Sequence, residues 1–241
     1  MRLEPPVVVT KDQIVFDVRE IEPFLQAPPM DLKPWPNAMI TLKDGKVMFI
    51  RAAKKDEVPL ILPYLKKVMD VQHDFYDIVG VRVYAELLGW YRSRLKDPYV
   101  IVGLIDGVLA GLANGRMWNK DISISHHSMT FVRRGQIGAA LYYCKAYYAL
   151  EVLGCKEFWS TFESYMGWRL GFQMCQPSYP WPERQHELGG AAVYYITQEH
   201  WNQSIKNYAH QMIGSDLVFE NIPDEVVQAN EVMHVPEEVA V

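Results

Sequence analysis

The chain has 241 residues, of which 49% are hydrophobic and 22% charged, and its formal net charge is -5. This composition excludes a disordered chain, and the lack of a basic stripe argues against a nucleic-acid partner. No apolar run approaches the ~20 residues that span a bilayer, so we expect no membrane partner. Three cysteines without metal-ligand spacing, and a start without a signal-peptide pattern, indicate reduced thiols, no metal site and a cytoplasmic location.

Residues 1–45 form a proline-rich segment, which we interpret as an extended N-terminal arm. Seven of the fifteen prolines of the chain lie in it. Proline at this density disfavours long helices and favours extended backbone. Short apolar runs at 7–9, 14–16 and 24–25 alternate with the prolines, and such runs suit docking on a protein partner.

Residues 46–213 carry an ordered series of strands and helices, which we interpret as one domain. Two β-rich runs flank Asp106-Gly107, the signal of a two-residue hairpin turn, so we expect a hairpin over 99–113. Further strands are predicted at 46–52, 122–132, 156–160 and 191–197. Helices are predicted at 54–72, 82–95, 137–153, in a short stretch before 171–172, and at 200–212, with Pro63 expected to kink or restart the first of them.

Residues 214–241 differ from the rest in charge. From Glu220 onward they contain six acidic residues and no Lys or Arg. We interpret them as an acidic C-terminal tail, which is usually solvated and only sometimes an interaction segment.

The stretch from Phe131 to Leu141 is the most informative of the chain. It ends a predicted strand, makes a short basic turn with glycine, and opens a helix. Arg133 and Arg134 thus stand beside the unpaired backbone N–H groups at the positive end of a helix dipole. Such a terminus is a site for phosphate or pyrophosphate.

This stretch, together with three others, resembles the GNAT acetyltransferase superfamily over roughly residues 46–200. The others are Phe49-Ile-Arg-Ala-Ala53, Val102-Gly-Leu-Ile-Asp-Gly-Val-Leu-Ala-Gly111 and Leu170-Gly-Phe172. The resemblance implies an α/β (α+β) fold, a GNAT-like mixed β-sheet flanked by helices, here with an extended N-terminal arm and an acidic C-terminal tail. It also implies a V-shaped opening in the sheet between the strand ending near Val132 and the strand at 157–160.

The resemblance implies that acetyl-CoA binds at the basic turn. The splayed strand end would pair with the pantetheine amides, the N–H groups from Gly135 to Ala139 would meet the pyrophosphate, and an arginine would neutralise its charge. In the family pattern Arg/Gln-x-x-Gly-x-Gly/Ala, Gln136 stands where the middle glycine is expected. The cofactor-binding candidates are Phe131, Val132, Arg133, Arg134, Gly135, Gln136, Ile137, Gly138 and Ala139.

The catalytic candidates are His126, His127, Glu163 and Tyr165. A histidine titrates near neutral pH and can take a proton from an amine, although packed histidines are the commoner case. Because side chains alternate along a strand, we expect only one of the two histidines to face the substrate. Glu163 and Tyr165 are either groups near the leaving thiolate or ordinary helix residues, and the family's general-acid tyrosine position falls on Gly167.

Two functions follow. The first is a GNAT-like N-acyltransferase that transfers an acetyl group from acetyl-CoA to an amine, weakly if the altered turn impairs it. The second is a catalytically inactive GNAT-fold structural component of a large assembly, for example a viral particle. In that case residues 1–45 and 214–241 would bind protein partners or other copies of the chain, and the location would be the particle.

Overall fold

A computed structural model describes residues 18–28, 31–71, 76–96, 98–132, 135–162, 164–178, 184, 193–207 and 209–239. Within these residues one sheet has the strand order β1-β2-β3-β4-β5-β6-β8-β7. Its strands are β1 (Ala38–Thr41), β2 (Val47–Ala52), β3 (Pro98–Ile105), β4 (Val108–Asn119), β5 (Ile122–Thr130), β6 (Glu157–Ser160), β7 (Gln176–Ser178) and β8 (Val193–Thr197).

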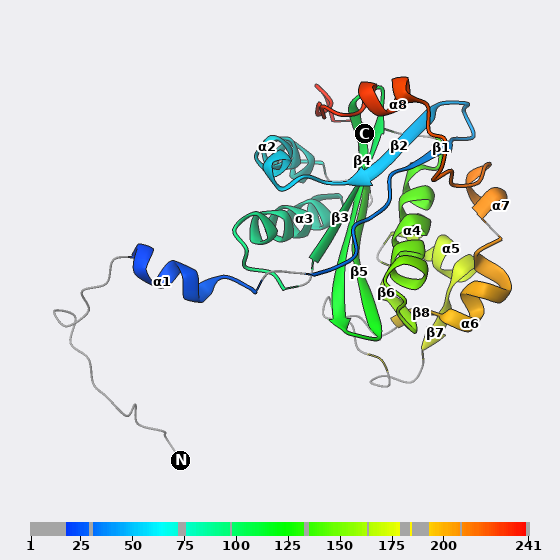
Figure 1. The fold of residues 1–241 in the computed structure, drawn as a ribbon, viewed down its shortest axis with the longest axis horizontal. Helices are drawn as coiled ribbons and strands as arrows, with labels where there is room; N and C mark the ends of the chain where they lie inside the picture. The colour runs from blue at the N-terminus through cyan, green and yellow to red at the C-terminus, as the bar shows by residue number, and fades with distance from the viewer. Residues whose placement is uncertain are drawn as a thin grey trace, which may run out of the picture.

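The helices cover both faces of this sheet. Figure 1 shows α2 and α3 on one side and α4 to α7 on the other, and a separate apolar core lies on each side. The α-helices are α1 (Val18–Leu25), α2 (Val58–Met69), α3 (Tyr76–Tyr91), α4 (Ile137–Tyr147), α5 (Tyr165–Met174), α6 (Gln198–His200), α7 (Ala209–Ile213) and α8 (Asp224–Ala229). A 3-10 turn (Lys55–Glu57) precedes α2, and π-helical turns extend α4 (Tyr148–Val152) and α6 (Trp201–Ile205).

The predicted order of elements is confirmed from β2 to β8, and so is the mixed sheet. The Asp106-Gly107 hairpin forms as expected, because both residues have positive φ, 50° and 77°, as this turn requires. The strand at 122–132, the helix after the basic turn and the short strand near 157 also form.

The opening in the sheet lies between β5 and β6. These two strands are parallel and pair only over Ile122–Ile124 and Glu157–Trp159. Beyond that point β5 continues to Thr130 while β6 ends at Ser160, so residues 125–130 have no partner on β6 among the residues described. The V-shaped opening is where the sequence predicts it.

Several boundaries differ from the predictions. Helix α3 begins at Tyr76 and not at 82, and it continues through Gly80, which lies against Met69 of α2. Helix α2 continues through Pro63 without a break. The single helix predicted over 200–212 is wrong, because short helical turns replace it. Strands β1 and β7 were not predicted.

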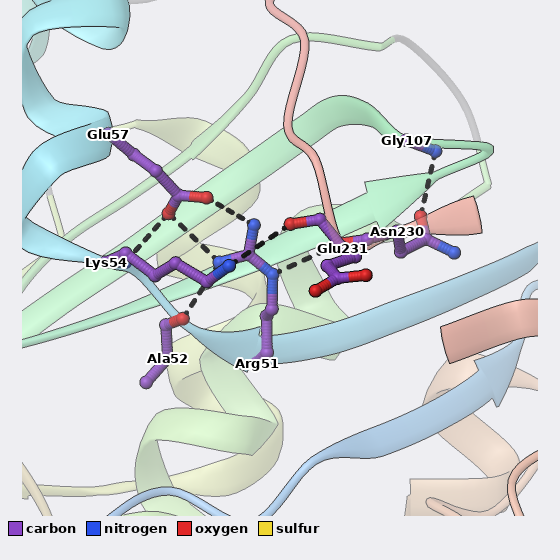
Figure 2. A network of polar contacts seen from close by, with 7 residues as sticks. All are labelled: Arg51, Ala52, Lys54, Glu57, Gly107, Asn230 and Glu231. Atoms are coloured by element: carbon purple, nitrogen blue, oxygen red, sulfur yellow. Dashed lines mark hydrogen bonds and ion pairs between the residues drawn. The ribbon is translucent and has the colours of Figure 1, made fainter. Parts of the chain in front are cut away.

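The C-terminal tail packs against the sheet and is not free. Val218 pairs with Met39 of β1. The N–H of Leu109 donates to the carbonyl of His234, and the N–H of His234 donates to the carbonyl of Gly107. Figure 2 shows the central contact: Asn230 Oδ1 accepts from the N–H of Gly107 at 2.9 Å. The acidic side chains of this segment are exposed, as the interpretation of a solvated tail expects, but its backbone is docked on the sheet.

Arg51 of β2 joins the tail to the N-terminal half of the sheet. Its side chain is 7% exposed; Nη1 donates to Glu57 Oε2 at 3.0 Å, and Nε donates to the carbonyl of Asn230 at 3.4 Å (Figure 2). The ion pair and the carbonyl together satisfy a buried guanidinium, which would otherwise be costly.

The N-terminal arm contains one helix, α1, where the proline pattern predicts extended backbone, and its extended residues 38–41 form strand β1 of the sheet. Helix α1 lies apart from the sheet in Figure 1, and Phe24 on it is 85% exposed. The apolar runs at 7–9 and 14–16 lie outside the described residues. The division of the chain at 45 and 213 stays a prediction.

Candidate active site

A cavity of about 680 Å³ occupies the opening between β5 and β6. Its wall comes from the second half of β5, the turn at 135–136, the first turns of α4, the start of α5, and Tyr76 and Val79 of α3. Its volume is within the range of small-molecule sites. The cavity therefore joins the predicted cofactor turn to the predicted histidine pair.

The turn before α4 is left-handed at two successive residues. Gly135 has φ of 78° and Gln136, the N-cap of α4, has φ of 62°. Gln136 therefore adopts the conformation that glycine adopts without strain, at the position where the family pattern has glycine. Ile137, Gly138 and Ala139 follow in the first turn of α4 and line the cavity. Arg133 and Arg134 lie outside the described residues.

A β-bulge in β5 places both histidines at the same carboxylate. Ala113 of β4 pairs with Ser128 and Gly115 pairs with Ser125, so Asn114 alone faces two residues, His126 and His127. One extra residue breaks the alternation of side chains. The expectation that the histidines face opposite sides is therefore wrong: both line the cavity and both reach Glu86 of α3.

Glu86 is the centre of this cluster. His127 Nε2 lies 3.1 Å and His126 Nδ1 3.5 Å from Glu86 Oε1, while the side-chain amide of Asn114 donates to Glu86 Oε2. The three titratable side chains are at most 14% exposed. Burial opposes ionisation of Glu86, but hydrogen bonds and charge from the two histidines outweigh it and hold its pKa well below the usual range.

Lys145 of α4 meets the same bulge from the other face of the sheet. Its Nζ donates to Ser125 Oγ at 2.5 Å and to the carbonyls of His127 at 2.8 Å and Asn114 at 3.4 Å. The residue is 1% exposed. Burial lowers its pKa to about 7, although the charge of Glu86 opposes that shift.

The other candidates are placed as follows. Val132, Gly135, Gln136, Ile137, Gly138 and Ala139 line the cavity, and their role in cofactor binding stays a prediction. Phe131 is buried against Tyr64 of α2, with ring centroids 5.1 Å apart, and is not part of the described wall. Tyr165 is 65% exposed and stacks on Trp168, also outside that wall. Glu163 lies outside the described residues.

Sequence reasoning missed Glu86, Asn114 and Lys145. Lys145 carried a signal, because it is the one charged residue in the otherwise apolar stretch from 137 to 150. Glu86 lies three residues after Val83 and directly before Leu87, both of which are buried, so the helical spacing could have indicated that Glu86 is buried as well. Asn114 carried none, since its role depends on a bulge in the neighbouring strand.

The described wall of the cavity contains cations and no carboxylate. Lys43, Lys145 and Arg169 are its charged residues. Within the described parts of the chain, no group of three or more His, Cys, Asp or Glu residues could hold a metal ion. None of the described helices is long and apolar enough to cross a membrane.

Comparisons with known proteins bear on the fold alone. No family model and no curated protein matches the chain. Among solved structures, an uncharacterized protein from Bacillus halodurans superposes with a TM-score of 0.51 at 11% identity, covering 75% of this chain and 100% of that chain. The strand order, the splayed strands and the helix after the basic turn agree with the predicted architecture. The fold is GNAT-like.

Two further structures are similar at lower scores. One is the PaiA N-acetyltransferase from Thermoplasma acidophilum in complex with coenzyme A, with a TM-score of 0.43 and 10% identity over 62% of this chain and 98% of that chain. The other is a mutant of the spermidine N-acetyltransferase SpeG from Vibrio cholerae, with a TM-score of 0.44 and 14% identity over 65% of this chain and 96% of that chain.

Proposed function

We propose that this protein is an N-acetyltransferase that transfers an acetyl group from acetyl-CoA to an amine. One observation carries the proposal: a single cavity of about 680 Å³ brings together the first turn of α4, the unpaired edge of β5 and the His126–His127 pair. These are the parts needed to hold an anionic cofactor, position an extended chain and accept a proton.

The residues of the cavity fit acetyl-CoA. The unpaired edge of β5, residues 125–130, is about 16 Å long at a rise of ~3.3 Å per residue, so it suits an extended chain with amide groups. The N–H groups at the start of α4 and the helix dipole would hold the pyrophosphate. Lys43 and Arg169 add positive charge to the wall, which favours an anionic ligand.

Acetyl-CoA bound there would supply a thioester, whose C–S bond breaks as the amine forms the new C–N bond and CoA leaves as a thiol. The imidazoles of His126 and His127 would take the proton that the amine loses and return it to the leaving sulfur. Glu86 would stabilise the imidazolium that forms in between. General-base catalysis of this kind contributes roughly 10²- to 10⁴-fold in rate.

The proposal is tested by calorimetry with acetyl-CoA and by mass spectrometry of a panel of amines incubated with the protein and acetyl-CoA. We expect binding of acetyl-CoA and acetylation of at least one amine class. Changing both histidines, His126→Ala with His127→Ala, should abolish transfer. His200→Gln, a histidine outside the cavity wall, is the control that should retain it.

A wild-type protein that binds no acetyl-CoA would contradict the proposal. It would favour the predicted alternative, an inactive structural component. No observation on the described residues favours that alternative specifically, and the described part of residues 214–241 contacts the chain's own sheet. Binding of protein partners through 1–45 and 214–241 stays a prediction.

A further inference from the structure

Ser128 has a buried hydroxyl in the cavity wall that the rest of the protein does not use. Its Oγ is buried and has no hydrogen-bond partner among the residues that the structure describes. The two other serines of the described wall do have partners: Ser125 accepts from Lys145, and Ser164 accepts from the N–H of Gly167 at the start of α5. Buried side-chain polar atoms are nearly always paired, so this exception needs an explanation.

The position of Ser128 relates it to the reacting end of the cavity. It directly follows His127 in β5 and lies in the stretch that β6 leaves unpaired. The turn at 135–136 lies beyond the far end of that strand. A ligand that places its phosphates at the turn and extends along β5 toward the histidines therefore passes Ser128.

The neighbouring donors are engaged within the protein. The imidazoles of His126 and His127 contact Glu86, and Lys145 donates to Ser125 and to two carbonyls of the bulge. Ser128 thus supplies a side-chain hydroxyl, beside the backbone N–H groups of the β5 edge, for which the described residues hold no partner. A hydroxyl rotates freely to suit an acceptor, and a change of χ1 moves its oxygen between three staggered positions.

We propose that the hydroxyl of Ser128 donates a hydrogen bond to the thioester carbonyl oxygen of acetyl-CoA, an inference that rests on the proposed function. It makes Ser128 a group that distinguishes acetyl-CoA from free CoA. No described contact within the protein depends on this hydroxyl, so its removal costs the fold nothing.

Two matched variants test the proposal, Ser128→Ala and Ser125→Ala, each examined by calorimetry with acetyl-CoA and with CoA and by thermal melting without ligand. We expect Ser128→Ala to weaken acetyl-CoA binding roughly three- to tenfold, to leave CoA binding unchanged, and to leave the melting temperature unchanged or higher. Ser128→Thr, which keeps the hydroxyl, should restore affinity. Ser125→Ala should melt lower, because Lys145 loses an acceptor.

The outcomes separate this inference from the proposed function. If wild-type protein binds neither acetyl-CoA nor CoA, both are overturned. If wild-type protein binds acetyl-CoA and Ser128→Ala binds it equally well, or loses CoA to the same extent, the role of Ser128 alone is overturned. A lower melting temperature for Ser128→Ala would show that the hydroxyl has a partner within the protein, and would also overturn it.

Discussion

His126 and His127 are adjacent in sequence, yet their side chains meet one carboxylate because β5 has one residue more than β4 at Asn114. The bulge does two things at once. It collects titratable groups on one side, and it turns main-chain carbonyls toward Lys145 on the other. Clusters of this kind, buried and lining a cavity, are typical of functional sites.

Glu86→Gln tests the role of the carboxylate. We expect acetyl transfer to fall at least tenfold, since the imidazolium loses its partner, and the free energy of unfolding to fall by about 3 kcal/mol at pH 7. The folded pKa of Glu86 is depressed, so its contribution is present above pH 4.5, the ordinary value, and is lost as pH falls below it. Urea unfolding at pH 7, 5 and 4 should therefore show a steeper acid loss in wild type than in the variant.

The control is Asp77→Asn, a half-buried carboxylate in the first turn of the same helix and outside the described cavity wall, which should leave transfer unchanged and change stability by less than ~1 kcal/mol. Equal stability of Glu86→Gln and wild type at pH 7 would contradict the view that the carboxylate is ionised and bound in the folded protein.

Lys145→Met tests the buried lysine from the opposite face. Its folded pKa of about 7 lies below the ordinary 10.5, so the unfolded chain binds more protons between these values and stability rises with pH there. We expect the free energy of unfolding to increase by about 1.5 kcal/mol from pH 7 to pH 8.5 in wild type. The variant should lack this increase, whereas Lys156→Met, whose side chain is 75% exposed, should keep it.

The upper limit of pH 8.5 matters because burial raises the pKa of the thiols of Cys155 and Cys175 to about 12. Those groups ionise first in the unfolded chain, and above that pH they would oppose the effect of Lys145. A flat wild-type curve over pH 7–8.5 would refute the depressed pKa of the lysine.

At the scale of elements, local chemistry decided what the sequence could predict. Asp106-Gly107 specifies its hairpin through two residues of positive φ, and the apolar periodicity of 137–150 specifies α4, so both were predictable. The start of α3 was not, because Gly80 has low helix propensity and weakens the helix pattern there. The bulge at Asn114 depends on how two strands pair, which no single segment records.

The turn before α4 gives a prediction of its own. Gln136 pays the cost of a left-handed conformation, so Gln136→Gly should raise the free energy of unfolding by about 0.5–1 kcal/mol. We also expect tighter acetyl-CoA binding, since a backbone without Cβ lets a phosphate approach more closely. Thermal melting and calorimetry check both effects.

Gln228→Gly, in helix α8 away from the cavity, is the matched control and should lose about 1 kcal/mol, the opposite sign. Unchanged affinity of Gln136→Gly would mean that Cβ is not what limits binding, and that the turn has been remodelled for another purpose.

At the scale of the whole molecule, the two ends of the described chain contribute unequally. Glu22 of helix α1 forms an ion pair with Arg94 at 2.6 Å, and the N–H of Ala27, just after the helix, donates to the carbonyl of Ser93. The C-terminal tail contributes buried Met233 and Asn230 and pairs with β1 and the β3–β4 hairpin. The acidic composition of the C-terminal tail indicated a solvated segment. Its docking could not be predicted, because few of its residues are buried and their partners lie far away in the sequence.

Truncation should reveal this difference. Removing 214–241 exposes the hairpin turn and takes a hydrogen-bond partner from Arg51, so we expect a protein that melts far lower or does not fold. Asn230→Ala, a milder change, should cost about 2 kcal/mol through the unpaired N–H of Gly107. Removing 1–28 should change the melting temperature little, because exposed ion pairs contribute at most ~1 kcal/mol. The melting temperatures of the three variants are measured by circular dichroism. A larger drop for the N-terminal truncation than for the C-terminal truncation would contradict this prediction.

The contact between Arg51 and Asn230 also bears on how the chain folds during translation. The two residues are 179 positions apart in the sequence, and a ribosome adds roughly 5–20 residues per second. The segment that contacts Arg51 is therefore synthesised on the order of 9–36 s after β2. During that interval the edge of β1 and the tip of the β3–β4 hairpin stay uncovered. The nascent chain is therefore expected to complete this part of its fold only once residues 214–239 have emerged, and to need protection of these edges until then.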